Sequence, residues 1–155
     1  MATSTNIQYL ESTAKDEFGA TVQIGAGTSD RRQIETFLAG AAITAGDWVQ
    51  FDTSATGANR VLTVIQATAV ALGNPLTVGV ALTAATVAGQ KVDVVVGGFV
   101  EVCNVDGAVV AGSPLTVDTT AGRAHVAATG DIVTCGVALA ADVANVAPVW
   151  VFKQF

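Results

Sequence analysis

Apolar side chains recur at every second position in the middle of this chain, and that period constrains the fold most. Val92, Val94 and Val96 share one face of an extended segment at residues 91–96, and a second alternating segment follows a glycine pair at residues 99–103. Successive side chains of a strand point to opposite faces, so a period of two is typical of a half-buried strand. The pattern predicts two strands with turn chemistry between them.

Part of this region recurs further along the chain. Gly-Val-Ala-Leu at residues 79–82 returns at residues 136–139, and each copy is followed by an apolar strand. An alanine- and glycine-rich segment precedes each copy, at residues 39–46 and 111–116. We interpret the body as two degenerate copies of one β unit, the second with shorter loops.

Other strand-like segments are separated by turn-forming residues at intervals near ten residues. They cover residues 34–38, 47–52, 60–65, 78–82, 102–105, 108–110, 117–118, 123–126, 131–139 and 148–152. Asp106-Gly107 predicts a hairpin between two of them. The spacing indicates an all-β, single-domain β-sandwich or β-barrel of short strands. Any helix should be short and should lie in the alanine-rich stretches at 66–72 or 139–145.

The composition excludes several classes of protein. Hydrophobic residues make up 51% of the chain and charged residues 13%, whereas disordered chains combine low hydrophobicity with many charges. Residues 61–90 carry no charge, but polar residues interrupt them too often for a membrane span. The net charge of −6 is the opposite of the basic footprint that nucleic-acid binding requires. We therefore expect neither a nucleic-acid nor a membrane partner, and the first residues show no signal-peptide pattern.

Residues 1–35 differ in texture from the rest. They hold eight of the 20 charged residues (7 basic plus 13 acidic) and the single tyrosine, Tyr9, with no sustained strand or helix period. We therefore divide the chain into an N-terminal arm at residues 1–35 and a β body at residues 36–155. The arm is expected to pack outside the body or to reach a neighbour, and a simply disordered tail is equally compatible with residues 1–6.

Five residues of the arm are candidate contacts with a partner protein or a second subunit. Tyr9, Leu10 and Phe18 are candidate apolar anchors. Arg31 and Arg32 are candidate partners for carboxylates on a neighbour, because the planar guanidinium pairs well with a carboxylate.

Catalytic and metal-binding patterns are sparse. His125 is the single histidine and lies in a strand-like segment without a nucleophile motif, so we expect a surface or half-buried histidine. Cys103 and Cys135 lack the short spacings of zinc ligands and are expected to be buried, reduced thiols. We found no complete phosphate loop or calcium loop. The sequence predicts a non-enzymatic protein with no cofactor, metal or catalytic residues.

An ordered series of short segments resembles a known family. The series begins with Ala-Gly-Ala-Ala-Ile-Thr-Ala-Gly-Asp at residues 39–47, and later members include Gly-Phe-Val at 98–100 and Ala-Gly-Ser-Pro-Leu at 111–115. Across residues 36–152 the chain is similar to tailed-phage head decoration proteins, also called capsid cement proteins. Residues 1–35 match no pattern of that family.

The resemblance implies a specific function. Such proteins are non-enzymatic, mostly β and commonly trimeric, and they sit on the outer face of the capsid. It implies a homotrimer, made in the host cytoplasm, that binds the major capsid protein and stabilises the virion.

Two other function classes stay open from the residues alone. A carbohydrate-binding or host-surface-binding β module on the virion would expose two or more aromatic side chains side by side. An enzyme, such as a hydrolase, would place a carboxylate and a polar pocket beside His125.

Overall fold

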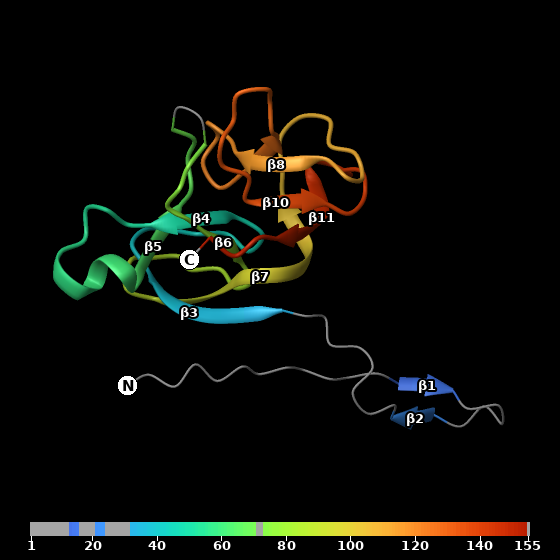
Figure 1. Cartoon of the computed structure of the whole chain (residues 1–155). Coiled ribbons are helices and arrows are strands. Elements are labelled where there is room, and N and C mark those ends of the chain that lie inside the picture. Colours follow the sequence, from blue (N-terminus) through green and yellow to red (C-terminus); the bar gives the residue numbers. More distant parts are fainter. Residues whose placement is uncertain (1–12, 16–20, 24–31, 71–72, 155) are drawn as a thin grey trace.

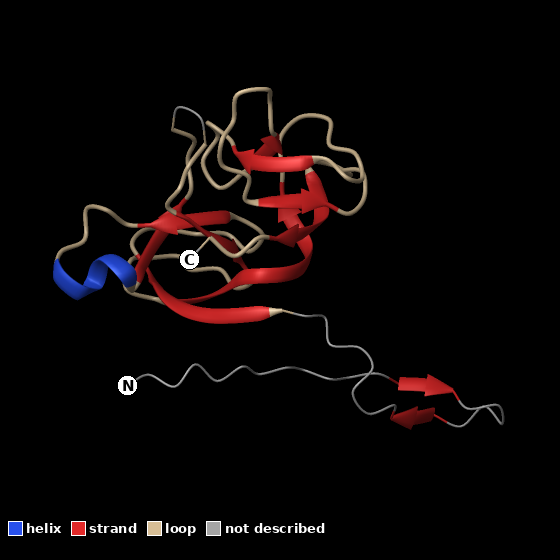
Figure 2. Cartoon of the chain, in the orientation of Figure 1, coloured by secondary structure: helices blue, strands red, loops and turns tan. Residues whose placement is uncertain are grey.

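The structure is a computed structural model that describes residues 13–15, 21–23, 32–70 and 73–154. Nearly all regular structure in these ranges is β, as the sequence predicts (Figures 1 and 2). The strands are β1 (Thr13–Lys15), β2 (Thr21–Gln23), β3 (Gln33–Ala39), β4 (Trp48–Phe51), β5 (Thr63–Gln66), β6 (Thr77–Ala81), β7 (Lys91–Asn104), β8 (Pro114–Val117), β9 (Ala124–Val126), β10 (Gly136–Ala138) and β11 (Val146–Val151). A 3-10 turn, η1 (Gly57–Val61), is the helical segment found in the described residues.

Strands β3 to β7 close into a barrel. Hydrogen-bonded neighbours run in the order β3-β5-β4-β6-β7, and β3 also pairs with β7, which completes the ring. β3 is parallel to β5, and the other pairs of the ring are antiparallel. Closure leaves no unpaired strand edge in this ring. Of the two architectures that the sequence left open, the structure contains the barrel.

β7 is a continuous strand of 14 residues, so the predicted break at its glycine pair was wrong. Residues up to Gly97 pair with β3, and residues from Gly98 onward pair with β11. Gly98 has a φ of 105°, a conformation that glycine adopts without strain. The glycine pair marks a change of partner strand rather than a turn.

The strands after β7 repeat the connectivity of the first barrel. β8 pairs with β9 and β10, and β10 pairs with β11, just as β4 pairs with β5 and β6, and β6 pairs with β7. The second half of β7 takes the place that β3 has in the first barrel. β3 is antiparallel to β7 and parallel to β5. Likewise, the second half of β7 is antiparallel to β11, and Val105, which follows it, forms a parallel bridge to Ala124 of β9. We call residues 33–97 the first unit and residues 98–151 the second unit. The two units share β7.

The loops of the two units also share an equivalent backbone hydrogen bond. In each unit a glycine N–H donates to the alanine carbonyl of the repeated Gly-Val-Ala-Leu segment, over 2.8 Å in both. These bonds run from Gly46 to Ala81 and from Gly112 to Ala138. The repeated segments therefore occupy equivalent strands, β6 and β10. The internal duplication predicted from the sequence is confirmed.

Each unit encloses its own apolar core. The first core contains Phe37, Ala39, Ile43, Val49, Val64, Val78, Ala81, Ala85, Val92, Val94 and Val96. The second contains Val100, Cys103, Val105, Val109, Leu115, Val117, Ala124, Cys135, Ala138, Ala147, Val149 and Val151. Trp48, Val80 and Val95 belong to strands of the first unit but join the second core. The two units pack together through this row of side chains.

Several local predictions were wrong. Residues 108–110 form no strand, because Val109 N donates to the Asp142 carboxylate instead of completing a hairpin. The start of the predicted strand at 60–65 belongs to η1, and residues 131–135 precede β10 without strand structure. The described parts of 66–72 and 139–145 contain no helix. At residues 108–110 a loop contact thus replaces the local strand propensity.

β1 and β2 pair antiparallel in a separate two-stranded sheet (Figure 1). The first unit begins with β3 at Gln33, and Arg32 is the described residue that precedes it. No helix in the described residues is long and apolar enough to cross a membrane.

Candidate functional site

Of the five predicted contact residues, the structure places one. Tyr9, Leu10, Phe18 and Arg31 lie outside the described residues. The Arg32 guanidinium lies over the ring of Phe99, 5.8 Å from its centroid, within the range of a cation–π contact. Arg32 is therefore tied to β7 of its own chain.

Arg32 also lines a pocket between the two units, with a volume of about 340 Å³. The other lining residues are Ala45, Gly46, Ala81, Leu82, Val100, Glu101 and Val102. Most of these side chains are small or aliphatic, and Val102 is 53% exposed. This pocket can receive an apolar side chain but offers few groups for acid–base chemistry.

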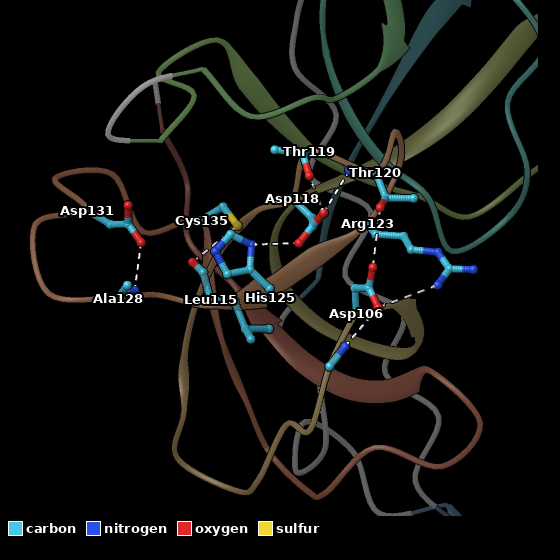
Figure 3. Close-up of polar contacts among 11 residues, drawn as sticks. Asp106, Leu115, Asp118, Thr119, Thr120, Arg123, His125, Ala128, Asp131 and Cys135 are labelled. Atoms are coloured by element: carbon cyan, nitrogen blue, oxygen red, sulfur yellow. Dashed lines mark hydrogen bonds and ion pairs between the residues drawn. The ribbon is translucent and has the colours of Figure 1, made fainter.

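His125 has a carboxylate beside it, which sequence analysis did not identify (Figure 3). Its Nδ1 lies 3.0 Å from Asp118 Oδ2, although off the line that a straight hydrogen bond requires. β8 and β9 form a hairpin in which Thr116 pairs with His125, so Asp118 at the end of β8 comes close. The predicted turn between residues 118 and 123 could have shown this proximity had its register been worked out.

The Asp118 carboxylate is held by the turn that follows it. Partial burial alone would raise its pKa, but hydrogen bonds from the Thr120 N–H and the Thr119 hydroxyl, together with the nearby Thr120 hydroxyl and His125, hold the pKa of Asp118 below its usual value. Asp52 is the equivalent residue of the first unit, and hydrogen bonds from Ser54 lower its pKa in the same way. The repetition of this arrangement indicates a structural role for Asp118 in closing the turn.

A chain of weaker polar contacts continues along the same surface. The Thr120 hydroxyl donates to Asp106 over 3.3 Å, and an Arg123 guanidinium nitrogen lies 4.0 Å from the same carboxylate (Figure 3). Arg123 and Asp106 are both more than one-third exposed, so this ion pair contributes little to stability.

Thr116, the cross-strand partner of His125, is one candidate nucleophile for the His125–Asp118 pair. Its hydroxyl is buried, with 2% of the residue exposed, and has no hydrogen-bond partner among the described residues. A catalytic triad requires a hydrogen bond between nucleophile and base, and that contact is missing here. The described residues also contain no group of three or more His, Cys, Asp or Glu that could hold a metal ion.

Cys103 and Cys135 are free and buried in the second core, as the sequence predicts. Burial raises the pKa of both thiols, and the proximity of Cys135 raises that of Cys103 further. The indole N–H of Trp48 has no nitrogen or oxygen acceptor and lies beside the Cys103 sulfur, a weak acceptor. These thiols are therefore poor nucleophiles.

Aromatic side chains are distributed unevenly between core and surface. Trp48 is fully buried, and Phe37 packs edge-to-face on Phe51 with centroids 6.1 Å apart. Trp150 is half-buried on the outward side of β11, beside its cross-strand partner Phe99. Phe152 is 39% exposed, two residues beyond Trp150. The aromatic side chains that the structure describes thus divide between packing inside the first unit or between the units and a partly exposed set on and just beyond β11.

Comparisons with known proteins give a match at the level of the fold. No family model matches the chain. No curated protein matches it either. Among solved structures, the N base of the head fiber protein gp8.5 of bacteriophage phi29 is similar, with a TM-score of 0.55 and 13% sequence identity over 79% of this chain and 95% of that chain. The chain therefore shares the fold of a phage head fiber base domain.

Proposed function

We propose that this protein is a capsid decoration protein, which binds the outer face of an assembled phage head and stabilises it. The observation that carries the proposal is the fold shared with a phage head fiber base domain, almost all of which is covered by the match. The ordered sequence segments across residues 36–152, which resemble head decoration proteins, point the same way independently of the fold.

The physical mechanism is thermodynamic linkage. A ligand that binds the assembled shell but not its dissociated subunits stabilises the shell in proportion to its occupancy. Contacts repeated over a symmetric surface add through multivalency, so each contact can be small. Such a protein needs a rigid body and exposed contact surfaces, and it needs no catalytic groups.

The proposed partners are the major capsid protein and further copies of this chain, as a homotrimer on the outer capsid surface. Tyr9, Leu10, Phe18 and Arg31 of the arm remain candidate contacts with the capsid or a neighbouring subunit. Arg32 already contacts Phe99 in its own chain, so we assign it a weaker role in capsid binding.

Heating of decorated and undecorated capsids tests this proposal. Purified protein is mixed with expanded capsids that lack it, unbound protein is removed, and capsid rupture is followed by light scattering during heating. The decorated capsids should rupture at a higher temperature. Failure to bind, or binding without a rise in rupture temperature, would exclude the proposal.

If the role is non-enzymatic, removing the imidazole of His125 should not affect it. His125→Ala should leave capsid binding and stabilisation unchanged, apart from any cost in packing. Loss of capsid stabilisation by a variant with normal folding and normal binding would indicate chemistry at the His125–Asp118 pair.

Carbohydrate or host-surface binding is the second candidate function. The partly exposed aromatic group at Trp150, Phe99 and Phe152 favours it, because sugars stack on such rings. The neighbours of Trp150 on the same face are aliphatic rather than polar, and Arg32 lies over Phe99, so protein contact suits this surface better. Binding of purified protein to immobilised host-envelope glycans, lost in Trp150→Ala, would support the second candidate.

A further inference from the structure

The duplication creates two equivalent rows of side chains on the outward faces of the two units. In the first unit Trp48 of β4 pairs with Val80 of β6, which pairs with Val95 of β7. In the second unit equivalent strands place three side chains in the same register. These are Pro114 of β8, Val137 of β10 and Trp150 of β11. Both rows are apolar and both carry one tryptophan.

The rows differ in what covers them. Trp48, Val80 and Val95 are each 0% exposed, because the second unit packs on them. In the second row Pro114 is exposed, while Val137 and Trp150 are partly exposed. The row of the second unit therefore lacks the cover that the row of the first unit receives.

The covering surface of the second unit can be identified from its contacts. Trp48 N donates to Gly122 O over 2.9 Å, and Asn104 N donates to Gly46 O over 2.9 Å. Asn104 also donates from Nδ2 to Asp47 Oδ1 over 2.8 Å. Gly122, two residues before β9, bonds to Trp48 of the row, and Asn104, at the end of β7, bonds to the two residues that precede Trp48. Both therefore lie at the edge of the row of the first unit.

The equivalent positions in the first unit are occupied by leucines. Leu62 precedes β5 as Gly122 precedes β9, and Leu38 lies in β3 where Asn104 lies in β7. Leu38 is 37% exposed and Leu62 is 48% exposed, and Leu38 N donates to Leu62 O over 2.8 Å. The first unit thus presents an adjacent pair of exposed leucines at the place where the second unit carries its covering surface.

We propose that the Pro114–Val137–Trp150 row of one copy packs on the Leu38–Leu62 surface of the next copy. The contact repeats between chains the packing that the two units make within a chain. Within the chain, Asp47 and Asn104 form a hydrogen bond at this contact. Between copies, Ser113 takes the place of Asp47 and Leu38 takes the place of Asn104, so the contact between copies is the more apolar one. Burial of apolar surface on both sides favours association.

This contact is heterologous, because it joins two different surfaces. Such contacts form a closed ring when the rotation between copies closes and an open filament when it does not. A closed ring of three would give the homotrimer of the proposed function, which this inference deepens by naming its interface. The experiments below use free protein without capsids, so their outcome is independent of whether capsid binding succeeds.

Paired cysteines test the geometry directly. Trp48 and Gly122 are joined by a backbone hydrogen bond, so residues 114 and 62 of neighbouring copies should lie close enough for a short crosslink. Pro114→Cys with Leu62→Cys in one chain should give a ladder of covalent multimers under mild oxidation or with a short bismaleimide. The native Cys103 and Cys135 are buried and should not react.

The single-cysteine variants provide the control. Pro114→Cys alone and Leu62→Cys alone should each remain uncrosslinked, whereas a mixture of the two should give covalent dimers and nothing larger. Efficient crosslinking of either single variant with itself would overturn the head-to-tail arrangement, because it would place like surfaces face to face.

Solution mass tests the energetic part of the proposal. Val137→Glu and Leu38→Glu alter opposite surfaces, and each should reduce the mass measured by light scattering from a multiple of the chain to a single chain, with an unchanged circular dichroism spectrum. Val143→Glu is the matched control, since Val143 is 78% exposed in the loop between β10 and β11, where its backbone pairs with Val146 and not with a residue of either surface.

The proposal is overturned if the unmodified protein is a monomer at its highest soluble concentration and the paired cysteines do not crosslink. It is also overturned if Val137→Glu leaves the mass unchanged but abolishes glycan binding. In that case the exposed row serves a carbohydrate ligand instead.

Discussion

Replacing Gly79 with alanine tests how closely β6 approaches β7. A Cβ on Gly79 would overlap the carbonyl oxygen of Val95 and lie 2.8 Å from its carbonyl carbon, a separation that folded proteins do not tolerate. The obstacle is backbone of the strand that both units share, so no side-chain rotation relieves it. Relief requires a shift of β6 or β7, which disturbs both cores.

The expected cost of Gly79→Ala follows from this overlap. Overpacking a filled core costs about 1–3 kcal/mol, and the backbone obstacle places this variant at the upper end. For a chain of this size, 1 kcal/mol corresponds to about 2–4 °C in Tm. A loss of about 3 kcal/mol therefore predicts a Tm lower by about 6–12 °C.

Two further glycines provide graded controls. A Cβ on Gly136, the equivalent residue of the second unit, would lie 2.7 Å from the Trp150 carbonyl oxygen, so its cost should be intermediate. A Cβ on Gly97 in β7 would meet Lys153 Cβ at 3.6 Å, an ordinary contact. Gly97→Ala should be neutral or should stabilise the strand by about 0.5–1 kcal/mol, because alanine loses less backbone entropy.

Thermal unfolding followed by circular dichroism at one fixed protein concentration measures all three variants. The concentration is held constant because association shifts the apparent Tm. If Gly79→Ala unfolds at the temperature of the unmodified protein, or if Gly97→Ala loses as much as Gly79→Ala, the described packing of β6 against β7 is incorrect.

Four other predictions follow from the described contacts. Cys103 and Cys135 should react slowly with a thiol reagent in native protein and fully after denaturation, and a native disulfide would contradict this. The pKa of Asp118 is lowered in the folded protein, so its stabilising contribution is present above the unfolded pKa near 3.8 and is lost as the pH falls through the folded pKa. Asp118→Asn should therefore weaken the fall of Tm between pH 6 and pH 3. An unchanged dependence of Tm on pH would refute this role of Asp118. Asp47 accepts three hydrogen bonds and is 4% exposed, so Asp47→Ala should cost at least about 1.5–3 kcal/mol in urea denaturation. A cost below about 0.5 kcal/mol, which is typical of surface substitutions, would refute its structural role. Deleting residues 1–31 should leave the strand signal of the body intact, and unfolding of the truncated chain would show that the arm belongs to the core.

Local sequence patterns were sufficient for the fold class and for the duplication. Side-chain alternation at Val92, Val94 and Val96 identified a strand with one buried face, and the structure places all three in the first core. The repeated Gly-Val-Ala-Leu segment identified equivalent strands because the glycine of each copy, Gly79 or Gly136, lies against the backbone of the neighbouring strand with no room for a Cβ. These properties depend on residue type and spacing alone.

The polar cluster could be predicted only in part. His125 was recognised as a strand residue, but its carboxylate neighbour Asp118 depends on the register of the β8–β9 hairpin. The glycine pair in β7 suggested a turn because glycine is common in turns, whereas here Gly98 adopts its positive φ within a strand. The residue type determines which backbone conformations are accessible, and pairing with neighbouring strands determines which of them is adopted.

The sequence by itself therefore determined that this chain is built of short, half-buried strands arranged as two similar units. Only the tertiary structure decided that the units share β7, and that the row of the first unit with Trp48 is buried while the equivalent row of the second unit with Trp150 is partly exposed. Trp48 and Trp150 both lie in segments that the sequence predicts as strands, and their exposure differs because the second unit covers the row that contains Trp48 and nothing described covers the row that contains Trp150. Pairing between strands that are far apart in the chain, such as the β3–β7 pair that closes the barrel, cannot be read from a periodicity measured over a few residues.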